Sequence, residues 1–185
     1  ESGRASRGQS VYALLGAADR RDRIVAMIPV ADLSAAERYL VFLSRGGTMK
    51  RTALSEFSNP RSGGVIAAGV KPGDRILDVA LSDGLAEVML LSSGGKAIRF
   101  TEAEVPVVGR SAQGVKGMEV KDSEQVVGMV LIRRDANVLT VSEDAVGKRI
   151  PVSEFPLQKR GGMGTLVTPT GGAESRVVAA LEILD

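Results

Sequence analysis

The sequence of 185 residues contains no cysteine, no histidine and no tryptophan. Without cysteine there is no disulfide to indicate an oxidising compartment, so the expected location is a reducing cytoplasm. The absence of histidine and cysteine removes the commonest general base, the thiol nucleophile and most transition-metal ligands. The carboxylates are scattered singly along the chain. We therefore expect no catalytic residue, no metal site and no cofactor in this segment.

Long apolar runs are also missing, and no stretch approaches the length that spans a bilayer, so no membrane contact is expected. Aromatic residues make up only 3% of the chain, which argues against a surface for stacking single-stranded bases. Hydrophobic residues nevertheless make up 44%, a content typical of a folded domain. The first residue is Glu1, which suggests a piece of a longer protein.

What the sequence does contain is an internal repeat of about 50 residues, a period typical of propellers and solenoids. Residues 39–47, 87–95 and 137–145 align without gaps at offsets of 48 and 50 residues. Each copy leads to an Arg followed a few residues later by Gly, and the opening residues match only the second half of a copy. The chain is therefore divided into a half repeat, 1–37, and three whole repeats, 38–86, 87–136 and 137–185, within a single domain, 1–185.

Within each copy the local pattern predicts a strand, a glycine turn and a returning strand. Residues 88–91 are apolar, Gly94 and Gly95 form the turn, and residues 97–100 return. Gly114, which precedes the next β-rich segment, indicates a bend or a close backbone approach. Short strands at even spacing predict an all-β array of four-stranded blades, with about three and a half repeats of about 50 residues.

The net charge is only +2, so the position of the charges matters more than their sum. Basic residues concentrate in the first half of each repeat and in its Arg-Gly loop. If the repeats are arranged radially, equivalent positions fall on one rim, where cations beside glycines suit duplex phosphates. Single cations on edge strands can also serve to prevent strand pairing. The candidate DNA-binding residues are Arg45, Lys50, Arg51, Arg61, Lys96, Arg99, Arg110, Lys116, Lys148, Arg149, Lys159 and Arg160.

A seven-residue segment is the strongest local signal: Gln158, Lys159, Arg160, Gly161, Gly162, Met163 and Gly164. Together with the repeats, it resembles the C-terminal domain of the A subunit of bacterial DNA gyrase, whose basic box reads Q-R-R-G-G-K-G. Five of the seven positions match, and Lys159 is a conservative sixth. Met163 stands where the family box has lysine, and the segment lies in the last repeat, whereas the family's principal box lies in its first blade.

The resemblance implies a β-pinwheel, a propeller-like array whose blades exchange a hairpin and whose outer rim bends and wraps double-stranded DNA. It implies a non-catalytic part of an ATP-dependent type IIA topoisomerase that supports negative supercoiling near the nucleoid. The implied partners are DNA and the other parts of DNA gyrase, in both its A and its B chains. Two alternatives remain open. The first is the equivalent domain of the topoisomerase IV A subunit, which has fewer blades. The second is a protein-binding propeller, which would show an apolar patch as its hot spot.

Overall fold

The computed structural model describes residue 10, residues 12–13, 23–59, 61, 63–166 and 176–183. Each repeat contributes one antiparallel hairpin, and a third strand pairs with the first strand of that hairpin. The hairpins are β1 (Tyr39–Ser44) with β2 (Thr48–Ala53), β4 (Glu87–Ser92) with β5 (Lys96–Thr101), and β8 (Asn137–Ser142) with β9 (Gly147–Pro151). The third strands are β3 (Ile76–Ser82), β7 (Val126–Ile132) and β11 (Val177–Ile183).

The fourth strand of a sheet comes from the following repeat. Strand β6 (Val115–Lys116) pairs with β2, and β10 (Thr165–Leu166) pairs with β5. The sheets therefore have the orders β3-β1-β2-β6, β10-β5-β4-β7 and β11-β8-β9, here named blades 1, 2 and 3. The all-β array of blades is confirmed, with four strands in blades 1 and 2 and three in blade 3 among the described residues.

The turns of the hairpins require a left-handed backbone. Gly47 and Gly95 have φ values of +80° and +76°, and Ala145 takes the same region with φ +60° in the third hairpin. An alanine there is disfavoured because its Cβ crowds the neighbouring carbonyl. The close approach predicted at Gly114 is also confirmed, since a Cβ on that residue would lie 2.3 Å from the carbonyl oxygen of Met49.

A short 3₁₀ turn follows each hairpin and begins at a buried position. These turns are η1 (Leu54–Phe57), η2 (Glu102–Glu104) and η3 (Val152–Glu154). The first residue of each turn donates its backbone N–H to an equivalent carbonyl, from Arg38, Ala86 and Ala136 respectively. Leu54, Glu102 and Val152 therefore occupy the same place in the three repeats.

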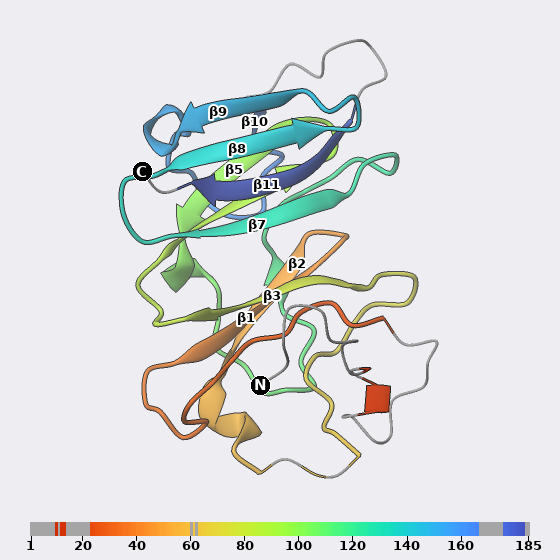
Figure 1. Cartoon of the computed structure of the whole chain (residues 1–185), viewed down its shortest axis with the longest axis vertical. Coiled ribbons are helices and arrows are strands. Elements are labelled where there is room, and N and C mark those ends of the chain that lie inside the picture. Colours follow the sequence, from red (N-terminus) through yellow and green to blue (C-terminus); the bar gives the residue numbers. More distant parts are fainter. Residues whose placement is uncertain are drawn as a thin grey trace, which may run out of the picture.

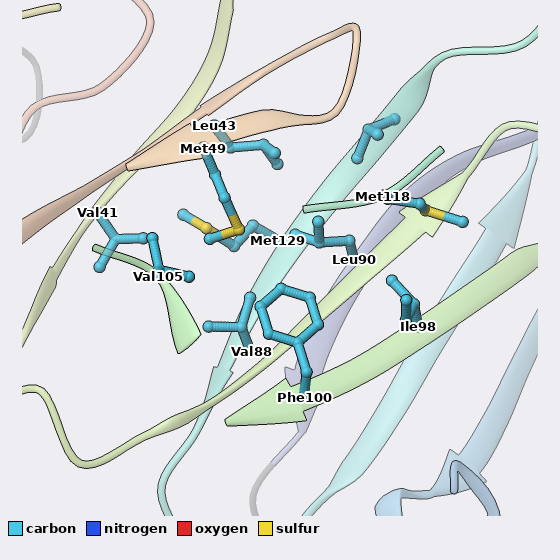
Figure 2. Close-up of a cluster of buried hydrophobic side chains, with 11 residues drawn as sticks. Val41, Leu43, Met49, Val88, Leu90, Ile98, Phe100, Val105, Met118 and Met129 are labelled. Atoms are coloured by element: carbon cyan, nitrogen blue, oxygen red, sulfur yellow. The ribbon is translucent and has the colours of Figure 1, made fainter. Parts of the chain in front are cut away.

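The core lies between consecutive blades. Figure 2 shows Met49 of the first hairpin packed with Val88, Leu90 and Phe100 of the second. The intervening residues Met89 and Leu91 face the opposite cluster, which blade 2 shares with blade 3. Because successive side chains of a strand point to opposite faces, β4 is buried on both sides and is almost continuously apolar.

Blade 3 is buried mainly on one face among the described residues. Strand β8 alternates half-buried and buried positions along its length, whereas five of the six residues of β4 are buried. Strand β7 packs against both β3 and β11, so these three strands form the inner side of the array (Figure 1). The opposite edge of each sheet is consequently its outer edge: β6, β10 and β9.

Candidate nucleic-acid interface

A group of the predicted cations lies along the outer edge of the array. Five of the twelve predicted DNA-binding residues are exposed, six are half-buried and Lys50 is buried. The exposed set is Arg61, Lys116, Lys148, Arg149 and Lys159, and the half-buried set is Arg45, Arg51, Lys96, Arg99, Arg110 and Arg160. Lys116 lies on β6, and Arg110 lies in the loop that leads to it. Lys148 and Arg149 lie on β9, and Lys159 precedes β10. These five residues line the outer edge, which is here defined as β6, β9 and β10 with the loops 109–114 and 158–164.

Lys116 on this edge is only lightly paired. Its Nζ lies 3.3 Å from Oε1 of Glu119, and both side chains are 55% exposed, so the attraction is weak in water. Lys148 and Lys159 are also exposed. These three lysines can therefore still attract a polyanion such as the phosphate backbone of DNA strongly.

Arg45 lies elsewhere, at the turn between β1 and β2. Its Nη1 donates to Oε1 of Gln125 at 2.9 Å, and it lines an open cleft together with Lys71 and Arg75. The last two residues were not predicted from the sequence. The Lys-Pro-Gly-Asp turn at 71–74 was visible, but only the folded chain brings it beside a turn about 30 residues earlier.

Four of the predicted residues are instead tied to backbone carbonyls of another repeat. The expectation that Lys50 lies on the rim beside Lys148 is wrong, because Lys50 is only 1% exposed. Its Nζ donates to the carbonyl oxygens of Gly109 and Arg110 at 3.0 and 2.5 Å and lies 5.1 Å from the ring centre of Phe42. Burial lowers the pKa of the Lys50 ammonium below its usual value.

Arg51, Arg99 and Arg160 are half-buried and behave in the same way. Arg51 donates from Nε to Val105 O, and Arg99 donates from Nη1 to Val152 O and Phe155 O. These guanidinium groups bridge repeats. Arg51 and Arg149 align in sequence, but Arg51 is half-buried whereas Arg149 is exposed. Whether any of the twelve residues contacts DNA remains a prediction.

The seven-residue box forms a seam between the second and third repeats. The backbone N–H of Gln158 donates to Arg99 O at 2.7 Å, and that of Gly161 donates to Gly117 O at 2.6 Å. Arg160 donates from Nε to Glu104 O and from Nη1 to Lys116 O. Its charge is therefore directed into the seam, and Lys159 is the box cation that faces solvent.

The glycines of the box allow this close contact. Gly161 and Gly164 have φ values of +87° and +73°, and a Cβ on Gly164 would lie 2.4 Å from Ala97 O. The carbonyl of Gly162 accepts a hydrogen bond from the N–H of Glu119. The side chain of Met163 is 40% exposed. The box composition thus serves strand joining as well as charge.

Among the described residues, no group of three or more carboxylates is arranged to hold a metal ion. No helix in the same part of the chain is long and apolar enough to cross a bilayer.

Comparison with known families gives one consistent result. A family model described as the DNA gyrase C-terminal domain, a β-propeller, matches residues 1–31, 38–83, 86–133 and 136–180. The A subunit of DNA gyrase from Pseudomonas aeruginosa is 41% identical over 145 residues, which cover 78% of this chain and 16% of that protein. The corresponding gyrase protein of Salmonella typhimurium is 37% identical over 186 aligned positions, which cover 100% of this chain and 21% of that protein. The chain spans about a fifth of the length of the curated relatives that it matches.

Solved structures show the same architecture. The C-terminal domain of DNA topoisomerase IV superposes with a TM-score of 0.89 and 29% identity, covering 96% of this chain and 55% of that one. A DNA gyrase A C-terminal domain superposes with a TM-score of 0.84 and 24% identity, covering 97% of this chain and 59% of that one. The second likeness, at its lower identity, supports the fold alone.

Proposed function

The chain belongs to the DNA gyrase C-terminal domain family, and from this premise we propose that it binds double-stranded DNA along its outer edge and bends the duplex around the blades. The observation that carries the proposal is the position of Arg110, Lys116, Lys148, Arg149 and Lys159 on or beside β6, β9 and β10. Cations placed on successive blades can follow one phosphate backbone from blade to blade.

The chemistry of this edge favours phosphate contacts over base reading. The described elements are strands and short 3₁₀ turns, and helical backbone occurs only at residues 12–13 of the described chain. None of these elements offers a recognition helix for the major groove. Aromatic residues are scarce, which disfavours base stacking. We therefore expect binding that depends little on DNA sequence and strongly on salt.

In the intact protein, the domain would act as the DNA-wrapping part of the gyrase A chain. We expect it to work with the remainder of that chain and with the gyrase B chain to support negative supercoiling. The chemistry of strand breakage would then belong to other parts of the enzyme. The high TM-score to a topoisomerase IV domain makes that enzyme the second candidate, with the same DNA-holding role.

Salt dependence tests the phosphate-edge proposal directly. With about five to eight phosphate contacts, a log–log plot of affinity against salt should have a slope of about −0.9 per contact. The double variant Lys148→Glu, Lys159→Glu should lower duplex affinity about tenfold or more. It should also make the slope less steep by the contribution of about two phosphate contacts. An affinity that does not change with salt, or a strong preference for one short site, would contradict the proposal.

A matched control is available near the inner strands. Arg134 follows β7, Arg176 precedes β11, and both are exposed. The double variant Arg134→Glu, Arg176→Glu makes the same change in net charge away from the outer edge. If this control loses as much affinity as the outer-edge variant, binding is diffuse and the edge has no special role.

A further inference from the structure

Two arginines make the same cross-repeat contact at successive blade junctions. Arg51 of β2 donates from Nε to Val105 O of the second repeat at 2.8 Å. Arg99 of β5 donates from Nη1 to Val152 O and Phe155 O of the third repeat, both at 3.0 Å. Each arginine therefore joins the hairpin of one blade to the residues at the 3₁₀ turn of the next.

A carboxylate accompanies each arginine, but it comes from a different place in the two junctions. Nη1 of Arg51 lies 3.6 Å from Oε1 of Glu102, which belongs to the following repeat. Nη2 of Arg99 lies 2.5 Å from Oε2 of Glu87, which belongs to the same repeat as Arg99. Tyr39 occupies the place of Glu87 in the first repeat, and its ring centre lies 5.3 Å from the guanidinium carbon of Arg51.

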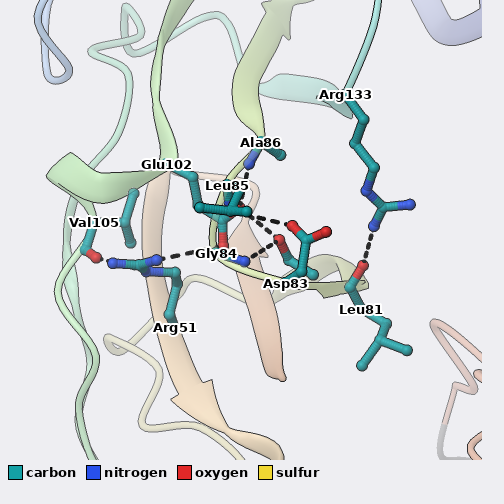
Figure 3. A network of polar contacts seen from close by, with 10 residues as sticks. Arg51, Leu81, Asp83, Gly84, Leu85, Ala86, Glu102, Val105 and Arg133 are labelled. Carbon is teal, nitrogen blue, oxygen red and sulfur yellow. Dashed lines mark hydrogen bonds and ion pairs between the residues drawn. The ribbon is translucent and has the colours of Figure 1, made fainter. Parts of the chain in front are cut away.

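Glu102 is unusual because its side chain is fully buried, whereas the equivalent residues are the aliphatic Leu54 and Val152. Its Oε2 accepts hydrogen bonds from the hydroxyl of Ser82 and the N–H of Ala86 (Figure 3). A buried carboxylate costs free energy that an aliphatic residue at the same place avoids. Packing therefore does not explain why a carboxylate occupies this buried position. The hydrogen bonds of Glu102 to the first repeat and its ion pair with Arg51 do explain it.

Two further cations tie the loops of the outer edge. Lys50 holds the carbonyls of Gly109 and Arg110, in the loop that leads to β6. Arg160 holds the carbonyl of Lys116, on β6 itself. The backbone of Arg110 and Lys116, two cations of the proposed DNA-binding edge, is thus held by the buried Lys50 and the half-buried Arg160.

We propose that Arg51, Arg99 and Lys50 are positioning residues that set the angle between consecutive blades, and so determine how far bound DNA bends rather than how tightly it binds. The inference rests on the proposed function. Burial of apolar surface between blades is non-directional, so by itself it specifies the angle between them less sharply than directional bonds do. Hydrogen bonds from a guanidinium to fixed carbonyls are directional and resist rotation. A direct DNA contact would require these side chains to face solvent, and that of Arg51 is only 11% exposed.

The double variant Arg51→Met, Glu102→Leu tests the inference without changing net charge. It removes one cation and one anion together, so the long-range attraction to DNA is preserved. The volumes are similar, and replacing a buried ion pair by apolar residues is often tolerated. The matched control is the exposed pair Lys121→Met, Asp122→Asn, which also leaves the net charge unchanged.

The blade angle can be measured directly because the chain has no cysteine. Ser55 and Ala103 are exposed and occupy equivalent places in η1 and η2. Spin labels on Ser55→Cys and Ala103→Cys should give a narrow distance distribution in the parent and in the control. The distribution should broaden or shift in the Arg51, Glu102 variant. An unchanged distribution would overturn the inference.

DNA binding and bending are then measured separately in the full chain. A duplex of about 12 base pairs is far shorter than the persistence length of about 150 base pairs, so it reports affinity without bending. The Arg51, Glu102 variant should bind it within about twofold of the parent. Energy transfer between the ends of a longer duplex should show a smaller bend in this variant than in the parent. A loss of short-duplex affinity equal to that of the Lys148, Lys159 variant would show a DNA contact instead.

Lys50→Met provides a second variant if the first one unfolds. It should broaden the distance distribution between the same two labels and reduce the bend of the longer duplex. Its affinity for the short duplex should fall less than that of Lys148→Met. If the two variants lose equal affinity for the short duplex, the inference is overturned. Failure of the proposed function gives a different result, in which the parent itself does not bend DNA. The label distances still decide the positioning role in that case.

Discussion

The junction between blades 1 and 2 and the junction between blades 2 and 3 have equivalent backbone contacts but different side-chain contacts. At the first junction a buried lysine, Lys50, holds two carbonyls of the next repeat. At the second junction Ile98 stands at that place, fully buried, with its Cδ1 3.6 Å from where a Cβ on Gly162 would lie. A polar and an apolar contact thus hold equivalent loops in equivalent positions.

The carboxylates differ in burial as well as in origin. Glu102 at the first junction has a fully buried side chain, whereas that of Glu87 at the second is 31% exposed. Ion pairs that keep some water lose little when one partner is removed, and fully buried ones lose much. The two junctions therefore share the arginine-to-carbonyl bond, while the counter-ion of the arginine comes from either repeat.

The largest expected difference follows from removing each arginine. Arg51→Met leaves the Glu102 carboxylate buried without its cation and should cost about 3–5 kcal/mol of unfolding free energy. Arg99→Met leaves the partly exposed Glu87 and should cost only about 1–2 kcal/mol. Urea unfolding followed by circular dichroism measures both. Equal losses would mean that the two junctions do not differ in burial cost.

Removing both charges at the first junction should recover most of the loss. The Arg51→Met, Glu102→Leu variant replaces the pair with apolar groups, and Leu54 shows that the fold accepts leucine at this place. We expect a stability within about 1 kcal/mol of the parent, which is a recovery of roughly 2–4 kcal/mol relative to Arg51→Met alone. A double variant no more stable than Arg51→Met alone would contradict the assigned ion pair.

Exchanging the lysine for the isoleucine of the other junction should have a smaller effect. Lys50→Ile removes two hydrogen bonds to Gly109 and Arg110 but leaves an apolar side chain of the kind found at Ile98. The expected cost is about 1–2 kcal/mol. Thermal unfolding gives the value, and Leu90→Lys, a cation at another fully buried position, serves as the control that should not fold. A cost above that range would show that the lysine does more than hold the loop.

The smallest expected effect concerns Asp78 of β3, which pairs in register with Leu43, where blade 2 has Gly128 and blade 3 has Ala179. Burial raises the pKa of the Asp78 carboxyl above 3.8, so the folded state holds its proton to a higher pH than the unfolded state. Stability contributed by this group is present at low pH and falls as pH rises through the folded pKa. Asp78→Asn should remove that fall and stabilise the domain at neutral pH by less than about 1 kcal/mol. A pH profile of stability identical to that of the parent would contradict this.

The repeated strands and their hairpin turns could be predicted from the sequence, because they depend on local patterns. The run of apolar residues in β4 indicates a strand that is buried on both faces. The turn glycines at 47 and 95 mark left-handed backbone that few other residues accept. The resemblance to the gyrase C-terminal domain, carried by the box and the repeats, is confirmed by the matching family model.

Only the tertiary structure decided which cations face solvent. Lys50 and Lys148 align in the repeat, yet the first is buried and the second is exposed. The difference lies in partners that are distant in sequence: the carbonyls that hold Lys50 are 59 and 60 residues away. A charged side chain is buried only where such acceptors replace its water, and a repeat pattern carries no information on them. The sequence by itself determined the repeated strands and the supply of cations, and the packing of one blade on the next decided which of them face solvent.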